Sequence, residues 1–221
     1  MKPSVAVCTA SGRDPKWPYA YAITCLMASI AGHVSKAVYH VEMGYATDYA
    51  RNKLVKSAIA EGFSHVLFID DDMAFPWDTP QRLLKHDKDI IAANYTKRQI
   101  PALPVAQKGG QYLFSRNKTG LEEADHAGTG LMMIKTEIFK SLPWPWFQTR
   151  LQDDENDPLV SDDVHFCRLA KAHGFQIWID HDLSQEIGHT GDFVYLHQHS
   201  PLEPSTPKDL LQLCEEQVIC G

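Results

Sequence analysis

The chain has 221 residues, of which 44% are hydrophobic and 22% are charged, the composition of an ordinary globular protein with one sizeable core. Its apolar runs fall short of the roughly 20 residues that a membrane-spanning helix needs. The formal net charge of −7 excludes a general nucleic-acid coat protein, because such proteins are strongly basic.

The N-terminus and the cysteines indicate a cytoplasmic protein without a membrane segment. The apolar stretch within MKPSVAVCTASGR is too short for the core of a signal peptide and instead predicts a first strand. The five cysteines form no CxxC pair, and an odd number without a secretion signal favours free thiols over disulfides. Their scattered spacing also argues against a structural zinc site.

Strand-like and helix-like segments alternate through the first part of the chain. Apolar, β-branched runs predict strands, and Ala-, Leu- and Met-rich runs predict helices. In chain order we expect a strand at 4–9, a helix at 17–32, a strand at 35–43, a helix at 47–61, a strand at 65–70, a helix at 79–86 and a strand at 89–94. Such alternation implies parallel strands joined by crossover helices. The expected fold is therefore an α/β, Rossmann-like three-layer sandwich with a mainly parallel central sheet.

The second half is less regular. It predicts a strand at 131–134, a loop at 143–158, a helix at 161–173 that Gly174 ends, and a strand at 175–180. We expect a single catalytic domain over 1–200. The Pro-rich stretch that begins at Ser200 then leads into a C-terminal tail, 201–221, with a short helix.

Three consecutive carboxylates, Asp70, Asp71 and Asp72, follow the buried strand HVLFI. Such a cluster is tolerated where a cation neutralises it or where water reaches it freely. Ligands of α/β sheets collect beyond the carboxyl ends of the strands. In extended backbone Asp70 and Asp72 point the same way, so we expect them to form a half-site for Mg²⁺ or Mn²⁺. A solvated acidic turn is the structural alternative.

Two further segments carry candidate chemistry. In Ser161-Asp162-Asp163, carboxylates in a first helical turn are explained by capping alone, but one of them is also a candidate general base. In Gly188-His189-Thr190-Gly191, the glycines bring the backbone close to a ligand, and imidazole is a common transition-metal ligand. A surface histidine is the alternative.

The glycine pair of Ala127-Gly128-Thr129-Gly130 precedes the strand LMMI. Glycines here let the backbone approach a sugar, and a plain turn explains them equally well; the spacing does not match a phosphate-binding loop. The stretch 90–121 has no acidic residue, whereas 122–192 has fourteen against five basic ones. A basic rim for a phosphate-bearing ligand beside an acidic floor is one reading of this asymmetry, and two solvated faces are the other.

Taken together, these segments resemble the GT-A fold glycosyltransferases, specifically the short family-2-like enzymes of bacteria and their phages. The resemblance runs from about Thr47 to Gly191. It is carried by A-R-N at 50–52, by F-I-D-D-D at 68–72, by the glycine-rich turn with its strand, by S-D-D-x-x-F-C at 161–167 and by the late G-H at 188–189. An aspartate stands at 162 where the family more often has glutamate, so the choice of base between Asp162 and Asp163 stays open.

The resemblance implies a metal-dependent hexosyl- or pentosyltransferase that uses a nucleotide-diphosphate sugar, with UDP as the expected carrier. We expect the transfer to an acceptor hydroxyl to be inverting, which requires a general base. The implied residues are Asp163 or Asp162 as base; Thr9, Arg51, Asn52, Asp70, Asp71, Gly128, Thr129 and Gly130 for the donor; and Asp70, Asp72 and His189 for Mn²⁺ or Mg²⁺. For a phage-encoded chain the location would be the host cytoplasm.

The acceptor is not written in the sequence. A saccharide, a protein and a modified DNA base all remain open. Two other functions share the acidic sheet edge: a metal-dependent nucleotidyltransferase, which would release pyrophosphate, and a non-catalytic nucleotide- or carbohydrate-binding domain, which would have no need of a base.

Overall fold

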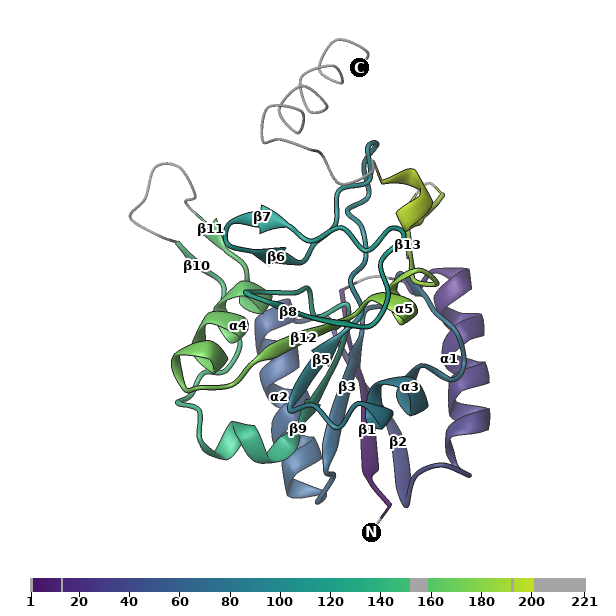
Figure 1. Ribbon diagram of the computed structural model, residues 1–221. Coiled ribbons are helices and arrows are strands. Elements are labelled where there is room, and N and C mark those ends of the chain that lie inside the picture. Colours follow the sequence, from purple (N-terminus) through teal and green to yellow (C-terminus); the bar gives the residue numbers. More distant parts are fainter. Residues whose placement is uncertain (1, 13, 152–158, 192, 201–221) are drawn as a thin grey trace.

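The computed structural model describes residues 2–12, 14–151, 159–191 and 193–200. Its centre is a seven-stranded sheet in the order β2-β1-β3-β9-β5-β12-β8 (Figure 1). The strands are β1 (Ser4–Ser11), β2 (Lys36–Met43), β3 (His65–Ile69), β5 (Ile90–Ala92), β8 (Leu121–Ala124), β9 (Leu131–Lys135) and β12 (Ile177–Asp180). The expected C-terminal tail and most of the acidic loop before β11 lie outside the described residues.

Five of these strands run in one direction. β1 pairs in parallel with β2 and β3, and β12 pairs in parallel with β5. β9 runs antiparallel between β3 and β5, and β8 runs antiparallel along β12. The mainly parallel α/β sheet expected from the sequence is confirmed, with two reversed strands that the alternation of elements did not indicate.

Helices cover both faces of the sheet. They are α1 (Trp17–Ile30), α2 (Thr47–Ala60), α3 (Thr79–Lys85), α4 (Asp162–Ala172) and the short α5 (His181–Ser184). Alternate residues of β1 enter two separate cores: Ala6 and Cys8 pack with residues of α2 and α4, whereas Val5 and Val7 pack with residues of α1 and α3. This two-sided burial makes the three-layer sandwich (Figure 1).

Short elements surround the main sheet. They are β4 (Met73–Ala74), β6 (Gln107–Lys108), β7 (Gln111–Tyr112), β10 (Arg150–Leu151), β11 (Leu159–Val160), β13 (Gly188–Thr190), β14 (Val194–Tyr195) and the 3₁₀ turns η1 (Thr136–Lys140) and η2 (His197–His199). Among them, β13 pairs antiparallel with β4. That pairing places the glycine-flanked histidine beside the acidic turn. No described helix is both long enough and apolar enough to cross a membrane.

Candidate active site

A cavity of about 420 Å³ lies at the carboxyl ends of β1 and β3. This is the edge where α/β sheets bind their ligands. Its lining residues come from five separate stretches of the chain: Ala10, Gly12, Thr47, Asp70, Asp71, Asp72, Tyr95, Arg98 and His189. The acidic triplet and His189, which the sequence singled out separately, are thus brought together by the fold.

The acidic triplet leaves the strand through a turn. β3 ends at Ile69, one residue earlier than expected, and the amide of Met73 donates to the carbonyl of Asp70 over 3.2 Å. Because the backbone is no longer extended, the expected alternation of side chains does not hold, and each carboxylate has its own partner. The Ser11 hydroxyl, for example, donates to Asp71 Oδ2 over 2.6 Å.

Asp72 and His189 face one another across the cavity wall. His189 Nε2 lies 3.4 Å from Asp72 Oδ2, and the amide of Thr190 donates to the Asp72 carbonyl over 2.7 Å. His189 Nδ1 lies 2.8 Å from the carbonyl oxygen of Thr96. A carbonyl can only accept, so Nδ1 donates a proton to Thr96, which fixes the ring with Nε2 facing Asp72.

This pair fits a divalent cation with two protein ligands. A carboxylate oxygen and an imidazole nitrogen suit Mn²⁺, and a carbonyl that orients the ring through its other nitrogen is the usual support of a histidine ligand. Within the described ranges no group of three or more His, Cys, Asp or Glu side chains is placed to hold a metal. The remaining positions would therefore fall to ligand oxygens and water.

Asp70 lines the same cavity and is paired with Arg51. One guanidinium nitrogen of Arg51 donates to both oxygens of Asp70, over 3.0 and 3.2 Å. The other donates to Asp162 Oδ2 over 2.7 Å. Arg51 is buried. From inside the protein it bridges Asp70 of the acidic turn and Asp162 at the start of α4.

The bridge sets the charge state of its members. Burial lowers the pKa of Arg51, but the negative charges of Asp70 and Asp162 raise it by more, so the guanidinium stays charged. Burial raises the pKa of Asp70, and the charge of Arg51 offsets part of that rise. In a buried ion pair the cost of desolvating the charges offsets much of their attraction, so the pair depends on good hydrogen-bond geometry.

The two acids of α4 differ in their surroundings. Asp162 is buried against Arg51. Asp163 is half-buried, and its Oδ1 accepts hydrogen bonds from the Ser161 hydroxyl and from the amide of Val164, the latter over 2.8 Å. Its Oδ2 has no hydrogen bond to any described residue. Asp162 Oδ1 likewise has no hydrogen bond to a described residue, so the two acids differ in burial and in the Arg51 pairing: Asp162 is buried and ion-paired, and Asp163 is the more accessible of the two.

Tyr95 explains the glycine-rich turn. Its hydroxyl accepts a hydrogen bond from the amide of Gly130 over 3.2 Å. A Cβ at either Gly128 or Gly130 would lie 2.7 Å from the Tyr95 ring, and one at Gly128 would lie only 2.2 Å from its hydroxyl oxygen. The ring also contacts His189 edge-to-face, with 5.2 Å between centroids. The glycines thus make room for the Tyr95 ring in the cavity wall. The sequence had suggested either close approach of the backbone to a sugar or a plain turn.

Several residues expected at the donor are buried and are not among those that line this cavity. Thr9 is buried, and its hydroxyl bonds the Ile69 carbonyl over 2.8 Å and the Tyr19 hydroxyl over 2.6 Å. Asn52 uses both ends of its amide on the loop after β9, with the carbonyl of Phe147 at 2.6 Å and the amide of Trp146 at 3.1 Å. Thr129 is fully buried, and its hydroxyl has no partner among the described residues.

Sequence reasoning missed five lining residues: Ala10, Gly12, Thr47, Tyr95 and Arg98. The last two have direct contacts to Asp72 and His189. Arg98 Nη1 donates to Asp72 Oδ2 over 2.8 Å, yet in the sequence it is one of several basic residues between 90 and 121. Tyr95 lies in a segment without a motif. The only available signal was position, since both closely follow β5, whose carboxyl end lies at the same sheet edge as that of β3.

No protein-family model and no curated protein sequence matches this chain. Solved structures do. The protein A197 from STIV has a TM-score of 0.57 at 12% identity, with 92% of this chain and 97% of that chain covered. UDP-glucose pyrophosphorylase complexed with UDP-glucose follows at a TM-score of 0.46 and 11% identity, with 81% and 90% covered.

A putative nucleotide-diphospho-sugar transferase from Desulfovibrio desulfuricans G20 has a TM-score of 0.42 at 10% identity, with 81% of this chain and 80% of that chain covered. At these identities the comparisons speak to the fold alone. The chain shares its overall architecture with the STIV protein over nearly the full length of both.

Proposed function

We propose that this protein is a family-2-like glycosyltransferase, of bacterial or phage type, that moves a hexose or pentose from a nucleotide-diphosphate sugar to an acceptor hydroxyl. The proposal rests on the convergence of motifs that lie more than a hundred residues apart in the chain. Arg51 joins Asp70 to Asp162, and the pairing of β13 with β4 brings His189 to Asp72.

The Asp72–His189 pair is the observation that carries the proposal. Asp72 Oδ2 and His189 Nε2 face one another over 3.4 Å, a spacing that two ligands of one cation would have. The pair lies on the wall of a cavity large enough for part of a nucleotide sugar. We infer that Asp72 and His189 would hold Mn²⁺ or Mg²⁺, with Asp70 close by to orient the ribose.

A bound divalent cation would supply positive charge to the departing diphosphate. The protein's own residues would do the rest. Asp163 Oδ2 takes the proton of the acceptor hydroxyl, the acceptor oxygen forms its bond to the anomeric carbon, and the bond from that carbon to the diphosphate breaks with inversion. The nucleoside diphosphate leaves with the electron pair, beside the guanidinium of Arg98.

The test is a thermal-shift panel of nucleotide sugars, with UDP-sugars first, in the presence and absence of Mn²⁺. A ligand that binds only the folded state raises the melting temperature, so a sugar donor should stabilise the wild type and do so more strongly with Mn²⁺. The Asp72→Asn variant should lose the metal-dependent part of the shift. No stabilisation by any nucleotide sugar would overturn the proposal.

The reaction products separate the enzyme classes. A glycosyltransferase releases a nucleoside diphosphate, whereas a nucleotidyltransferase consumes a nucleoside triphosphate and releases pyrophosphate. Binding without either product would indicate a non-catalytic domain.

A further inference from the structure

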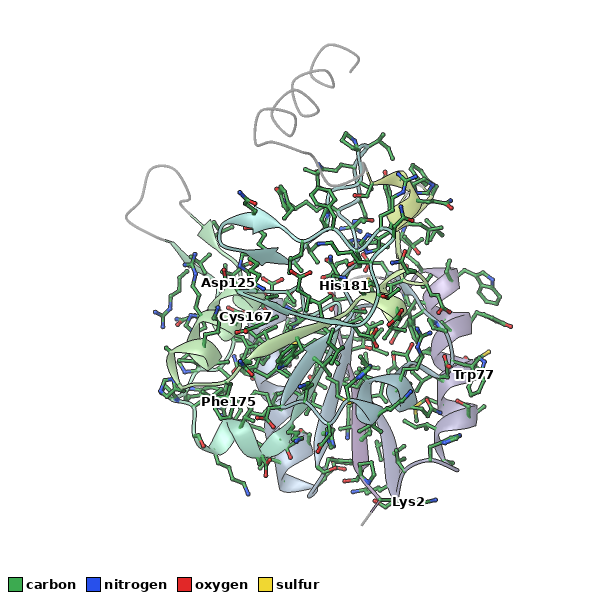
Figure 2. All side chains as sticks on the ribbon, in the orientation of Figure 1. Lys2, Trp77, Asp125, Cys167, Phe175 and His181 are labelled. Carbon is green, nitrogen blue, oxygen red and sulfur yellow. The ribbon has the colours of Figure 1, made fainter. Side chains whose placement is uncertain are left out.

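A second cavity of about 420 Å³ lies between the β6–β7 hairpin and α4. Its lining shares no residue with the first cavity: Gln107, Gly110, Asp125, His126, Arg168 and Lys171. Asp125 and Cys167 are labelled in Figure 2 and lie near one another on the α4 side of the sheet. None of these residues has a part in the donor site described above.

The second cavity carries an excess of positive charge. Lys171 is paired with Asp125, whose other oxygen accepts from the amide of Gly109 over 2.5 Å. Arg168 is exposed and makes no ion pair within the described part of the chain. Burial lowers the pKa of His126, which leaves its ring neutral at pH 7. One guanidinium fork is therefore open to an anionic group, with an ammonium close to it.

Helix α4 connects the two cavities. Asp162 in its first turn pairs with Arg51, which also holds Asp70 of the first cavity, and Arg168 and Lys171 on the same helix line the second. Asp163 follows Asp162 in that first turn and lines neither cavity. Its negative charge raises the pKa of His126, which lines the second cavity. It also raises the pKa of Tyr95, which lines the first. Helix α4 thus links the second cavity to the residues that hold the wall of the first.

We infer that the second cavity is the acceptor subsite, and that it takes an acidic saccharide whose phosphate or carboxylate binds Arg168 and Lys171. This inference rests on the proposed function, which makes Asp163 the base that takes the proton of the acceptor hydroxyl. The open Oδ2 of Asp163 then meets a hydroxyl of the bound saccharide.

A saccharide suits this cavity better than a nucleic acid. Nucleic-acid binding draws on many phosphate contacts along an extended basic surface, whereas this cavity offers one unpaired arginine and a lysine shared with Asp125. The chain as a whole has a net charge of −7, which disfavours a long polyanion but leaves a single local anion site intact.

The test follows the His126 ring by NMR while four probes are added: inorganic phosphate, glucose 6-phosphate, glucuronate and neutral methyl glucoside. An anion bound beside the imidazole stabilises its protonated form, so the acidic probes should raise the pKa of His126 and the neutral glucoside should not. Comparing the pKa shift of His126 with glucose 6-phosphate and with glucuronate shows whether the cavity recognises a phosphate or a carboxylate.

Three variants make the test specific. Arg168→Gln should weaken binding of the acidic probes by about 10-fold, the loss expected for a charge-assisted hydrogen bond. Asp125→Asn should strengthen it, because Lys171 loses its competing carboxylate. Arg82→Gln is the matched control. Arg82 lies on α3 and pairs with Glu186, away from the second cavity, so this change should leave binding unchanged.

Failure of this inference is distinguishable from failure of the proposed function. If nucleotide sugars stabilise the protein but no acidic probe shifts His126, or if Arg168→Gln binds the probes as the wild type does, the acceptor assignment is wrong and the donor site stands. A single-stranded oligonucleotide that shifts His126 at lower concentration than every acidic sugar would also overturn it. If the probes bind as expected and no nucleotide sugar binds, the anion site stands without the transferase, and its assignment to an acceptor is wrong.

Discussion

Arg98 and His189 approach the same carboxylate oxygen of Asp72, at 2.8 Å and 3.4 Å. A cation that bound Asp72 and His189 would therefore compete with the Arg98 guanidinium for that oxygen. Arg98 would be released toward the cavity, where a diphosphate would meet it. Under the proposed function, metal binding and diphosphate recognition would be linked through this one arginine.

The first prediction concerns Arg98. Arg98→Gln should strengthen Mn²⁺ binding, because Asp72 loses its competing cation, and should still lower kcat by about 10-fold or more, because a positive charge beside the departing diphosphate is lost. Isothermal titration with Mn²⁺ and a steady-state assay measure the two effects. Lys97→Gln is the neighbouring control and should change neither. A fall in Mn²⁺ affinity would show that Arg98 supports the cation site instead of competing for it.

The second prediction concerns His189. His189→Ala should lower Mn²⁺ affinity by at least about 10-fold, which is the order of loss found even for residues that support a ligand indirectly. Titration of the purified variant with Mn²⁺ measures it. The exposed His173, changed to Ala, serves as the control. Unchanged affinity in the His189 variant would leave Asp72 as the only protein ligand.

The third prediction separates the two acids of α4. Asp163→Asn should lower kcat by about 10²–10⁴-fold with little change in nucleotide-sugar affinity. Asp162→Asn should act first on stability, because it removes one partner of the buried Arg51; the cost is about 3 kcal/mol, to be read from urea unfolding. An inactive Asp162 variant beside a fully active Asp163 variant would reverse the assignment of the base.

The fourth prediction concerns pH. His197 is buried with its Nε2 at 2.7 Å from the Asn94 carbonyl, and burial lowers its pKa below the ordinary 6.5. The unfolded chain therefore takes up a proton more readily than the folded one. Stability is full above pH 6.5 and falls as the pH drops below it, by at most about 1.4 kcal/mol per pH unit for this group.

Urea unfolding at several pH values between 7.5 and 5 measures that slope. His197→Gln should reduce it, whereas the same change at the exposed His173 should not. A slope unaffected by His197→Gln would assign the acid sensitivity to other buried histidines, such as His181, whose pKa is also lowered by burial.

Long periodic segments were predictable from the sequence, and short pairings were not. The strands β1, β2, β3, β9 and β12 are apolar enough to be recognised, and the acidic turn was correctly expected at the edge that follows β3. A two-residue strand such as β4 has no periodicity of its own. Its pairing with β13, which brings His189 to Asp72, depends on the register of segments more than a hundred residues apart.

The chemistry of single residues was harder to predict than their position. Arg51 and Asn52 stand next to each other in the A-R-N segment, but the first bridges two carboxylates and the second holds the loop at Trp146 and Phe147. Neighbours in a helix point about 100° apart, so their partners lie on different elements. Only the packed structure shows which.

The contact between Tyr95 and the turn at Gly128 and Gly130 has an evolutionary consequence. A side chain at either glycine would meet the tyrosine ring, so these positions cannot change independently. Among descendants of this chain, a loss of either glycine should be accompanied by a smaller residue at 95. Such paired changes would deepen the cavity beside His189, and relatives that carry them would be the ones to search for a bulkier sugar donor.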